Sequence, residues 1–127
     1  FLKKKIEYSG KLYLEKGNTL LHGDYYPGSW MQDGNRSYII DPEFSFVGPK
    51  EFDLGVMAAH LIISNGKKNI IEQICNAYPG TKSVKKVQNF CGIEIMRRLI
   101  GLAQLPLERS LDEKEQLLIL AEEFILS

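Results

Sequence analysis

Carboxylate side chains are concentrated in two short polar segments in the first half of the sequence. Asp24 lies in a turn after a glycine, and Ser29 follows five residues later. Asp41 and Glu43 stand on either side of a proline. If these segments meet, three carboxylates and a hydroxyl could converge. Such an oxygen-rich set suits Mg²⁺, because Mg²⁺ binds carboxylates and keeps positions open for phosphate oxygens, whereas zinc favours histidine and cysteine.

The same side chains predict a site for phosphoryl transfer. A carboxylate that stays free of the metal could accept a proton from a substrate hydroxyl. The alternative is local: Asp24 and Asp41 would serve their turns by accepting hydrogen bonds from nearby backbone amides, as aspartates do in many loops. Spacing alone leaves both interpretations open.

Short strands must position these polar segments. The apolar run Thr19–Leu21 predicts a first strand, and Ser29–Met31 predicts a second after an interruption by glycine and proline. The Asp-Gly turn within Gln32–Arg36 predicts a tight hairpin with Ser37–Ile40 as the partner strand. Because paired strands place their ends together, the two polar segments could face one site.

Helical periodicity dominates the rest of the chain. Apolar spacing predicts helices over residues 2–14, 51–64, 69–78 and 83–103, and a last one from Ser110 to about Ile125. Ser110 and Glu113 have the spacing of a capping box. The helix over 51–64 is apolar nearly all round and should be central, so His60 on it is expected to be a buried, hydrogen-bonded histidine rather than a ligand. The fold class is therefore α+β, mostly α.

Composition limits the partners. The 127 residues are 44% hydrophobic and 25% charged, as in ordinary one-domain globular proteins, and sixteen basic residues balance sixteen acidic ones. A net charge of zero argues against nucleic acid and against anionic membrane surfaces. No window approaches about 18 consecutive apolar residues, so we expect no membrane span.

Two further features of the sequence concern its context. Cys75 and Cys91 lie in apolar helical patterns without CxxC spacing, so we expect buried free thiols in a reducing compartment, the cytoplasm. The sequence opens at Phe1 inside a helical pattern, without an initiator methionine or a capping residue. We therefore expect it to be a piece of a longer protein.

Motifs in the first half of the chain resemble those of the aminoglycoside phosphotransferase and choline kinase-like superfamily. The matching segments are Leu21–Ser29, Ile40–Phe44, Gly48–Pro49 and Phe52–Gly55. Within this superfamily, Ser29, the Asp-Pro-Glu triplet and the run Met96–Ala103 are most similar to the methylthioribose kinases. The resemblance extends from about Thr19 to Gln104. It implies that residues 1–127 are the C-terminal lobe of a protein kinase-like fold, in which a small β-hairpin carries the catalytic and metal loops.

The resemblance also implies roles for the residues of the first polar segment. Asp24 would be the catalytic aspartate that orients the attacking hydroxyl and accepts its proton. His22 would hold the loop in shape, and Asp53 would anchor the loop by accepting backbone hydrogen bonds. Ser29, Asp41 and Glu43 would bind Mg²⁺, and Ser29 and Asp41 would in this way hold the phosphates of ATP.

Substrate binding is implied for a second group of residues. Arg97 and Arg98 match an arginine pair that binds sugar and phosphate groups, which suits the bidentate guanidinium. They should point about 100° apart on a helix, so one is expected to reach solvent or a carboxylate. Tyr26, with Tyr25 and Trp30, could line the substrate pocket, although Trp30 alternates into a strand and such residues more often belong to the core.

The implied activity is the ATP- and Mg²⁺-dependent transfer of the γ-phosphoryl group to a hydroxyl of a small molecule, with a methylthioribose-like sugar as favoured acceptor. An aminoglycoside, a choline-like alcohol or a homoserine-like alcohol is an alternative acceptor. The sequence lacks the glycine-rich phosphate loop, the strand lysine and the hinge of the N-terminal lobe. The fragment alone should therefore be inactive, and a truncated or degenerate pseudokinase that binds without catalysis is the other alternative. Analogy to methylthioribose kinases implies a homodimer.

Overall fold

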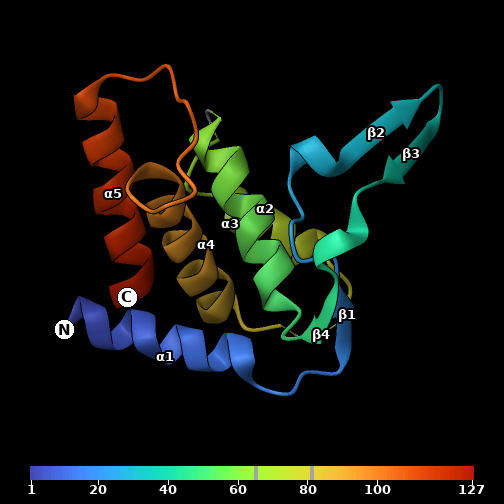
Figure 1. Cartoon of the computed structure of the whole chain (residues 1–127), viewed down its shortest axis with the longest axis horizontal. Helices are drawn as coiled ribbons and strands as arrows, with labels where there is room; N and C mark the ends of the chain where they lie inside the picture. The colour runs from blue at the N-terminus through green and yellow to red at the C-terminus, as the bar shows by residue number, and fades with distance from the viewer. Residues whose placement is uncertain (65, 81) are drawn as a thin grey trace.

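The computed structural model describes residues 1–64, 66–80 and 82–127. Within these residues the chain forms five α-helices and four short strands (Figure 1). In chain order the elements are α1 (Leu2–Leu14), β1 (Thr19–Leu21), β2 (Trp30–Asp33), β3 (Arg36–Ile39), β4 (Phe46–Gly48), α2 (Glu51–Ile63), α3 (Ile70–Ala77), α4 (Val84–Leu99) and α5 (Leu111–Leu126). Single 3₁₀ turns occupy Pro27–Ser29 and Pro42–Phe44. The predicted fold class, a mostly helical α+β domain with a small hairpin, is confirmed.

Helices α2, α4 and α5 form the core. As its sequence predicts, α2 is buried on most sides, and α4 packs between α2 and α5. Gly55 allows the close approach of α2 to α4, because a Cβ there would lie 2.6 Å from the Cβ of Phe90 and 2.9 Å from the nitrogen of Cys91. Helix α1 runs across the ends of α4 and α5 (Figure 1). This packed helical bundle supports the polar loops.

The strands form two separate antiparallel pairs. β2 and β3 make the predicted hairpin, with Met31 opposite Tyr38 and Gly34 at a φ of 56° in the turn. The hairpin projects away from the helices, and its strand residues are all exposed (Figure 1). β1 pairs instead with β4, a three-residue strand that the sequence did not predict. The partner residues of β4 lie 25 to 29 positions earlier in the chain, so no local pattern indicates this pairing.

Two helix ends test the local sequence signals. At α5 the capping box is confirmed: the nitrogen of Ser110 donates to Glu113 Oε2 at 2.8 Å, and the nitrogen of Glu113 donates to Ser110 Oγ at 3.2 Å. The prediction that α4 continues to residue 103 is wrong. The helix ends at Leu99, where the nitrogens of Ile100 and Gly101 both donate to the carbonyl of Met96, at 2.9 and 3.3 Å.

Burial decides two smaller predictions. Cys75 and Cys91 are buried and free, as expected. Trp30 is not a core residue: it is exposed on the hairpin, with its ring centroid 5.4 Å from that of Tyr25. None of the helices in the described part of the chain is both long enough and apolar enough to cross a membrane.

Candidate active site

The loop between β1 and the first 3₁₀ turn carries Asp24, and hydrogen bonds join this loop to α2. Asp53, in the first turn of α2, accepts hydrogen bonds from the backbone nitrogens of His22 (2.7 Å) and Gly23 (3.0 Å). Gly23 has a φ of 86°, and a Cβ there would collide with the backbone oxygen of Phe44. The loop can therefore pack against the backbone of Phe44 only with glycine at position 23, next to Asp24.

His22 fixes the conformation of the same loop. Its Nε2 lies 2.7 Å from the carbonyl oxygen of Ile40, and its Nδ1 lies 3.3 Å from the backbone nitrogen of Asp24. Because a carbonyl only accepts hydrogen bonds, Nε2 carries the proton and Nδ1 accepts from Asp24. One neutral imidazole thus joins the Asp24 loop to the segment that precedes Asp41. Both ring nitrogens of His22 are thus used in contacts with the backbone, which suits the predicted role of shaping the loop.

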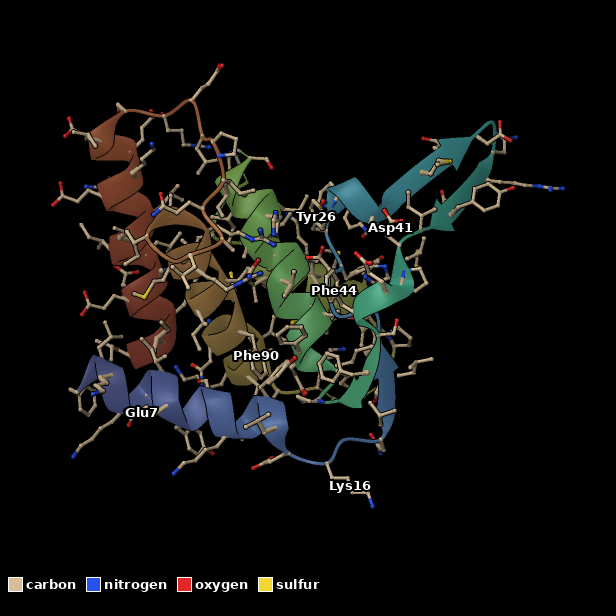
Figure 2. All side chains as sticks on the ribbon, in the orientation of Figure 1. Glu7, Lys16, Tyr26, Asp41, Phe44 and Phe90 are labelled. Carbon is tan, nitrogen blue, oxygen red and sulfur yellow. The ribbon has the colours of Figure 1, made fainter. Side chains whose placement is uncertain are left out.

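Asp41 adopts a left-handed backbone conformation, with φ 58° and ψ 55°. No other non-glycine residue of the described segments has a positive φ. This region is costly for most side chains and best tolerated by aspartate and asparagine, and such outliers concentrate at functional sites. Figure 2 shows Asp41 and Tyr26 at the base of the hairpin, near Phe44. Asp41 and Glu43 are both exposed to solvent.

The expected convergence of three carboxylates and a hydroxyl does not occur. Ser29 is 2% exposed, and its hydroxyl closes the 3₁₀ turn by donating to the carbonyl of Tyr26 at 2.8 Å. Asp24 lies beside an arginine of α4, with 3.5 Å between its Oδ1 and Nη2 of Arg98. Across residues 1–64, 66–80 and 82–127 no three His, Cys, Asp or Glu side chains are grouped to hold a metal. The oxygen donors of Asp41 and Glu43 still suit Mg²⁺, which often takes one or two carboxylates together with substrate phosphates.

The last turns of α4 place two arginines around one buried carboxylate, Glu94. Arg97 donates to it through Nε (2.7 Å) and Nη2 (3.1 Å), and Arg98 donates through Nε at 2.7 Å. His60 of α2 lies 3.1 Å from the same carboxylate, as expected for a buried and hydrogen-bonded histidine. Arg98 then reaches Asp24, with 3.5 Å between Nη2 and Oδ1. Both predicted substrate arginines are thereby anchored, and one contacts the predicted catalytic aspartate.

Glu94 was missed by the sequence analysis. Although burial raises the pKa of this carboxyl, the hydrogen bonds from His60, Arg97 and Arg98 lower it to about 2, so Glu94 is ionised at neutral pH. Its hydrogen bond also raises the pKa of Arg97. The available signal was the spacing, because an acid three and four residues before two arginines shares a helix face with them.

A cavity of about 560 Å³ opens beside Asp24, and we call it the α4 cavity. Charged, aromatic and aliphatic side chains all contribute to its lining. Its lining comprises Tyr13, Gly23, Asp24, Phe44, Phe52, Val56, Phe90, Ile93, Glu94, Arg97 and Arg98. This mixed lining suits a small molecule that carries both hydroxyl groups and an apolar substituent.

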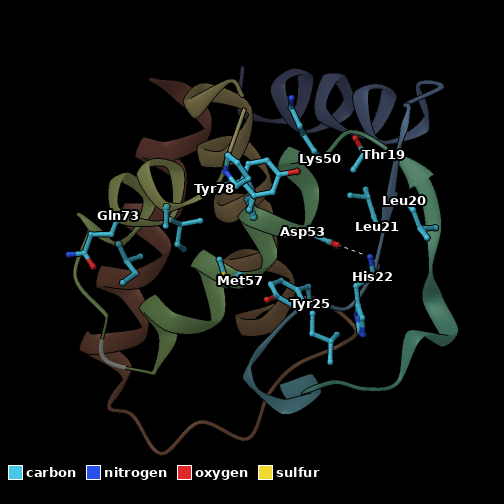
Figure 3. Close-up of a pocket in the computed structure, with 16 residues that line it drawn as sticks. Thr19, Leu20, Leu21, His22, Tyr25, Lys50, Asp53, Met57, Gln73 and Tyr78 are labelled. Atoms are coloured by element: carbon cyan, nitrogen blue, oxygen red, sulfur yellow. Dashed lines mark hydrogen bonds between the residues drawn. The ribbon is translucent and has the colours of Figure 1, made fainter. Parts of the chain in front are cut away.

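The predicted substrate residue Tyr26 does not line this cavity. Its ring packs on the imidazole of His60, with centroids 4.7 Å apart. A second cavity of about 620 Å³, lined by Asp53 among others, lies between β1, α2 and α3 (Figure 3). Its walls are mostly apolar, and Tyr25 belongs to them. Burial raises the pKa of Asp53, although its two backbone hydrogen bonds oppose this.

Residues 10–87, more than half of the chain, match the sequence profile of a phosphotransferase enzyme family. The chain belongs to this phosphotransferase enzyme family. Membership confirms the resemblance to aminoglycoside phosphotransferases, and with it the kinase-like fold. The matched residues include the Asp24 loop, the Asp41 segment and α2 with Asp53.

Curated relatives of this family member include several methylthioribose kinases. That of Exiguobacterium sibiricum is 41% identical over 63 residues, which are 50% of this chain and 16% of that protein. Methylthioribose kinase 1 of Oryza sativa is 38% identical over 63 residues, 50% of this chain and 15% of its own. That of Geobacillus kaustophilus is 26% identical over an aligned length of 141, covering 84% of this chain and 36% of its own. The chain thus spans between about a sixth and about a third of the length of these relatives.

Proposed function

We propose that this chain is the catalytic C-terminal lobe of a small-molecule kinase. The reaction transfers the γ-phosphoryl group of ATP, with Mg²⁺, to a hydroxyl of a methylthioribose-like sugar. The observation that carries the proposal is the placement of Asp24, whose side chain is one-third exposed at the edge of the α4 cavity, with its loop held by Asp53 and its carboxylate beside Arg98. The relatives named methylthioribose kinase support the choice of acceptor.

In this reaction Asp24 is the base. Its carboxylate accepts the proton of the acceptor hydroxyl as that oxygen forms a bond to the γ-phosphorus and the bond from phosphorus to the departing ADP oxygen breaks. Arg97 and Arg98 donate hydrogen bonds to acceptor oxygens or to the transferring phosphoryl group. Asp41 and Glu43 would hold Mg²⁺, which neutralises charge on the nucleotide phosphates when bound. Enclosure of the nucleotide falls to an N-terminal lobe, which we place outside these residues.

The walls of the α4 cavity support an acceptor with an apolar end. Phe44, Phe52 and Phe90 line this cavity together with the two arginines. A thioether packs favourably against aromatic rings, whereas the hydroxyls of a sugar pair with Asp24 and the guanidinium groups. An aminoglycoside is polar throughout and carries several positive charges, so aromatic walls next to two arginines suit it poorly.

A second candidate is a pseudokinase that binds a ligand without catalysis. It is favoured by Ser29, the predicted metal ligand, whose hydroxyl is committed to the backbone of Tyr26. The two candidates differ in turnover: a pseudokinase binds ligand in the α4 cavity, but the complete protein consumes no ATP with any acceptor.

The test is acceptor-dependent ADP release by the complete protein, with methylthioribose, an aminoglycoside, choline and homoserine as acceptors. We expect methylthioribose to give the highest kcat/KM, and Asp24→Asn to lower kcat by about 10²- to 10⁴-fold. Asp112→Asn, an exposed acid in the first turn of α5, is the matched control and should turn over normally. Near-normal turnover by Asp24→Asn would disprove its role as base, and a clear preference for an aminoglycoside would overturn the choice of acceptor.

A further inference from the structure

Glu94 is the point where three parts of the site meet. Its side chain is 6% exposed, and it accepts hydrogen bonds from Arg97 and Arg98 on its own helix. Across the helix interface it pairs with His60 of α2, whose ring is covered by Tyr26 from the catalytic loop. Glu94 therefore connects α4, α2 and the loop that carries Asp24.

The bonds to Glu94 determine how the arginines are presented. Both arginines donate through Nε, which fixes the plane of each guanidinium and leaves terminal nitrogens for other partners. The terminal nitrogen Nη2 of Arg98 lies 3.5 Å from Oδ1 of Asp24, and the Arg98 side chain is only 15% exposed. Arg97 is 47% exposed at the cavity edge. Without Glu94, these two long side chains would sample many rotamers and repel each other.

We propose that Glu94 is a positioning residue of the phosphotransfer site, which holds Arg98 against Asp24 and Arg97 at the mouth of the α4 cavity. The inference rests on the proposed function, since it gives the arginines their task of orienting the acceptor. Glu94 does not touch the acceptor in this arrangement, because the arginines satisfy its oxygens. Its effect reaches the reaction through Arg98.

A purely structural role, in which Glu94 only joins α4 to α2, is the competing explanation. The chain offers a matched control for it in Glu51, a second buried glutamate. Glu51 is 7% exposed and accepts a hydrogen bond of 2.9 Å from the nitrogen of Ser83, so it also joins two elements of the core. It does not line the α4 cavity. Loss of either carboxylate weakens the fold, but only one loss should disturb acceptor use.

The experiment compares Glu94→Gln with Glu51→Gln in the complete protein, using steady-state kinetics with methylthioribose and ATP. We expect Glu94→Gln to lower kcat/KM for the acceptor by about 10- to 100-fold, as for a misplaced orienting group, and to leave KM for ATP within about threefold. Glu51→Gln should lower Tm with kcat/KM within about threefold of wild type. Acceptor kinetics of Glu94→Gln that match those of Glu51→Gln would overturn the proposal.

A double-mutant cycle tests whether Glu94 acts through Arg98. In an Arg98→Met background, Glu94→Gln should cause little further loss of kcat/KM, whereas fully additive losses would contradict the proposal. If Glu94→Gln fails to fold, Arg98→Lys tests the same link, because one ammonium group cannot reproduce the fork between Glu94 and Asp24. An acceptor KM and kcat within twofold of wild type for Arg98→Lys would then count against it.

A spectroscopic measurement separates this proposal from the proposed function. In ¹⁵N NMR spectra of the complete protein, the Nε–H groups of Arg97 and Arg98 should exchange slowly with water, and Glu94→Gln should make both exchange fast. If the wild type transfers no phosphoryl group, the proposed function fails, but this signature still decides whether Glu94 positions the arginines. Unchanged exchange in Glu94→Gln would overturn the positioning role even in an active kinase.

Discussion

At the scale of single residues, a half-buried and a buried acid show how the type of hydrogen-bond donor affects ionisation. Asp53 accepts two hydrogen bonds from neutral backbone amides, and burial still raises its pKa. Glu94 is bonded by two guanidinium groups and an imidazole, and its pKa falls to about 2. Hydrogen bonds from charged donors are about twice as strong as those from neutral donors, so at Glu94 they overcome the desolvation cost. The arginine side of the site is therefore charged over the whole physiological pH range.

This difference predicts how stability depends on pH. A carboxyl whose pKa is lower in the folded chain contributes stability above its unfolded pKa and loses it as the pH falls toward the folded value. For Glu94 this window runs from pH 4.5 down to about 2, and the shift corresponds to about 3 kcal/mol. Urea unfolding of the complete protein between pH 7 and 3 should show a stability gap between wild type and Glu94→Gln that is constant above pH 6 and narrows below pH 4.5. A gap that does not change with pH would contradict the charged network.

At the scale of the elements, helix ends depend on a few local residues. The capping box at Ser110 was predicted from its spacing and is present, because both of its hydrogen bonds lie within one turn. The end of α4 was placed too late, because apolar spacing continues past Leu99. The helix nevertheless ends at Leu99. Just beyond it, at Gly101, the backbone passes so close to Arg97 that a Cβ would lie 2.6 Å from the carbonyl oxygen of Arg97. This end of the helix leaves the arginines in the last turn of α4, next to Asp24.

Removal of the cap of α5 should destabilise the bundle. Ser110→Ala should lower the free energy of unfolding by about 1 kcal/mol, because the backbone nitrogen of Glu113 loses its acceptor. Ser37→Ala, at an exposed position of β3, is the matched control and should change it by less than about 0.5 kcal/mol. Chemical unfolding of both variants measures the difference. Equal stability of the two would mean that solvent replaces the cap without cost.

At the scale of the whole molecule, the site depends on the distance between α2 and α4. Asp53 on α2 holds the loop of Asp24, and α4 carries Arg98, so the packing of the two helices brings base and arginine together. The contact is close at Gly55, where the neighbouring atoms belong to Phe90 and Cys91. A small change in this spacing would separate Arg98 from Asp24.

A pair of glycine substitutions tests this dependence. Gly55→Ala should destabilise the protein by about 1–3 kcal/mol, because its new methyl group overlaps α4. Gly10→Ala, on α1, meets nothing within 4 Å and should stabilise by about 0.5–1 kcal/mol through helix propensity. Thermal unfolding should show a lower Tm for Gly55→Ala and a higher Tm for Gly10→Ala. The kcat/KM for the acceptor should fall only in Gly55→Ala. Wild-type Tm and activity in Gly55→Ala would show that the two helices can separate freely.

Sequence alone determined the features that are local in the chain. Helix periodicity, the Asp-Gly hairpin, the cap at Ser110 and the order of Asp24, Asp41 and Asp53 all depend on residues a few positions apart or on motifs. These features predicted the fold class and the family.

Tertiary structure alone decided what the polar side chains contact. The bond from His22 to Asp53 joins residues 31 apart, and that from His60 to Glu94 joins residues 34 apart. Such contacts form only when helices pack, and no local pattern specifies them. For this reason the contact of Glu94 with His60 and that of Arg98 with Asp24 were not predicted. The hydroxyl of Ser29, expected at a metal, instead closes a local turn with the carbonyl of Tyr26.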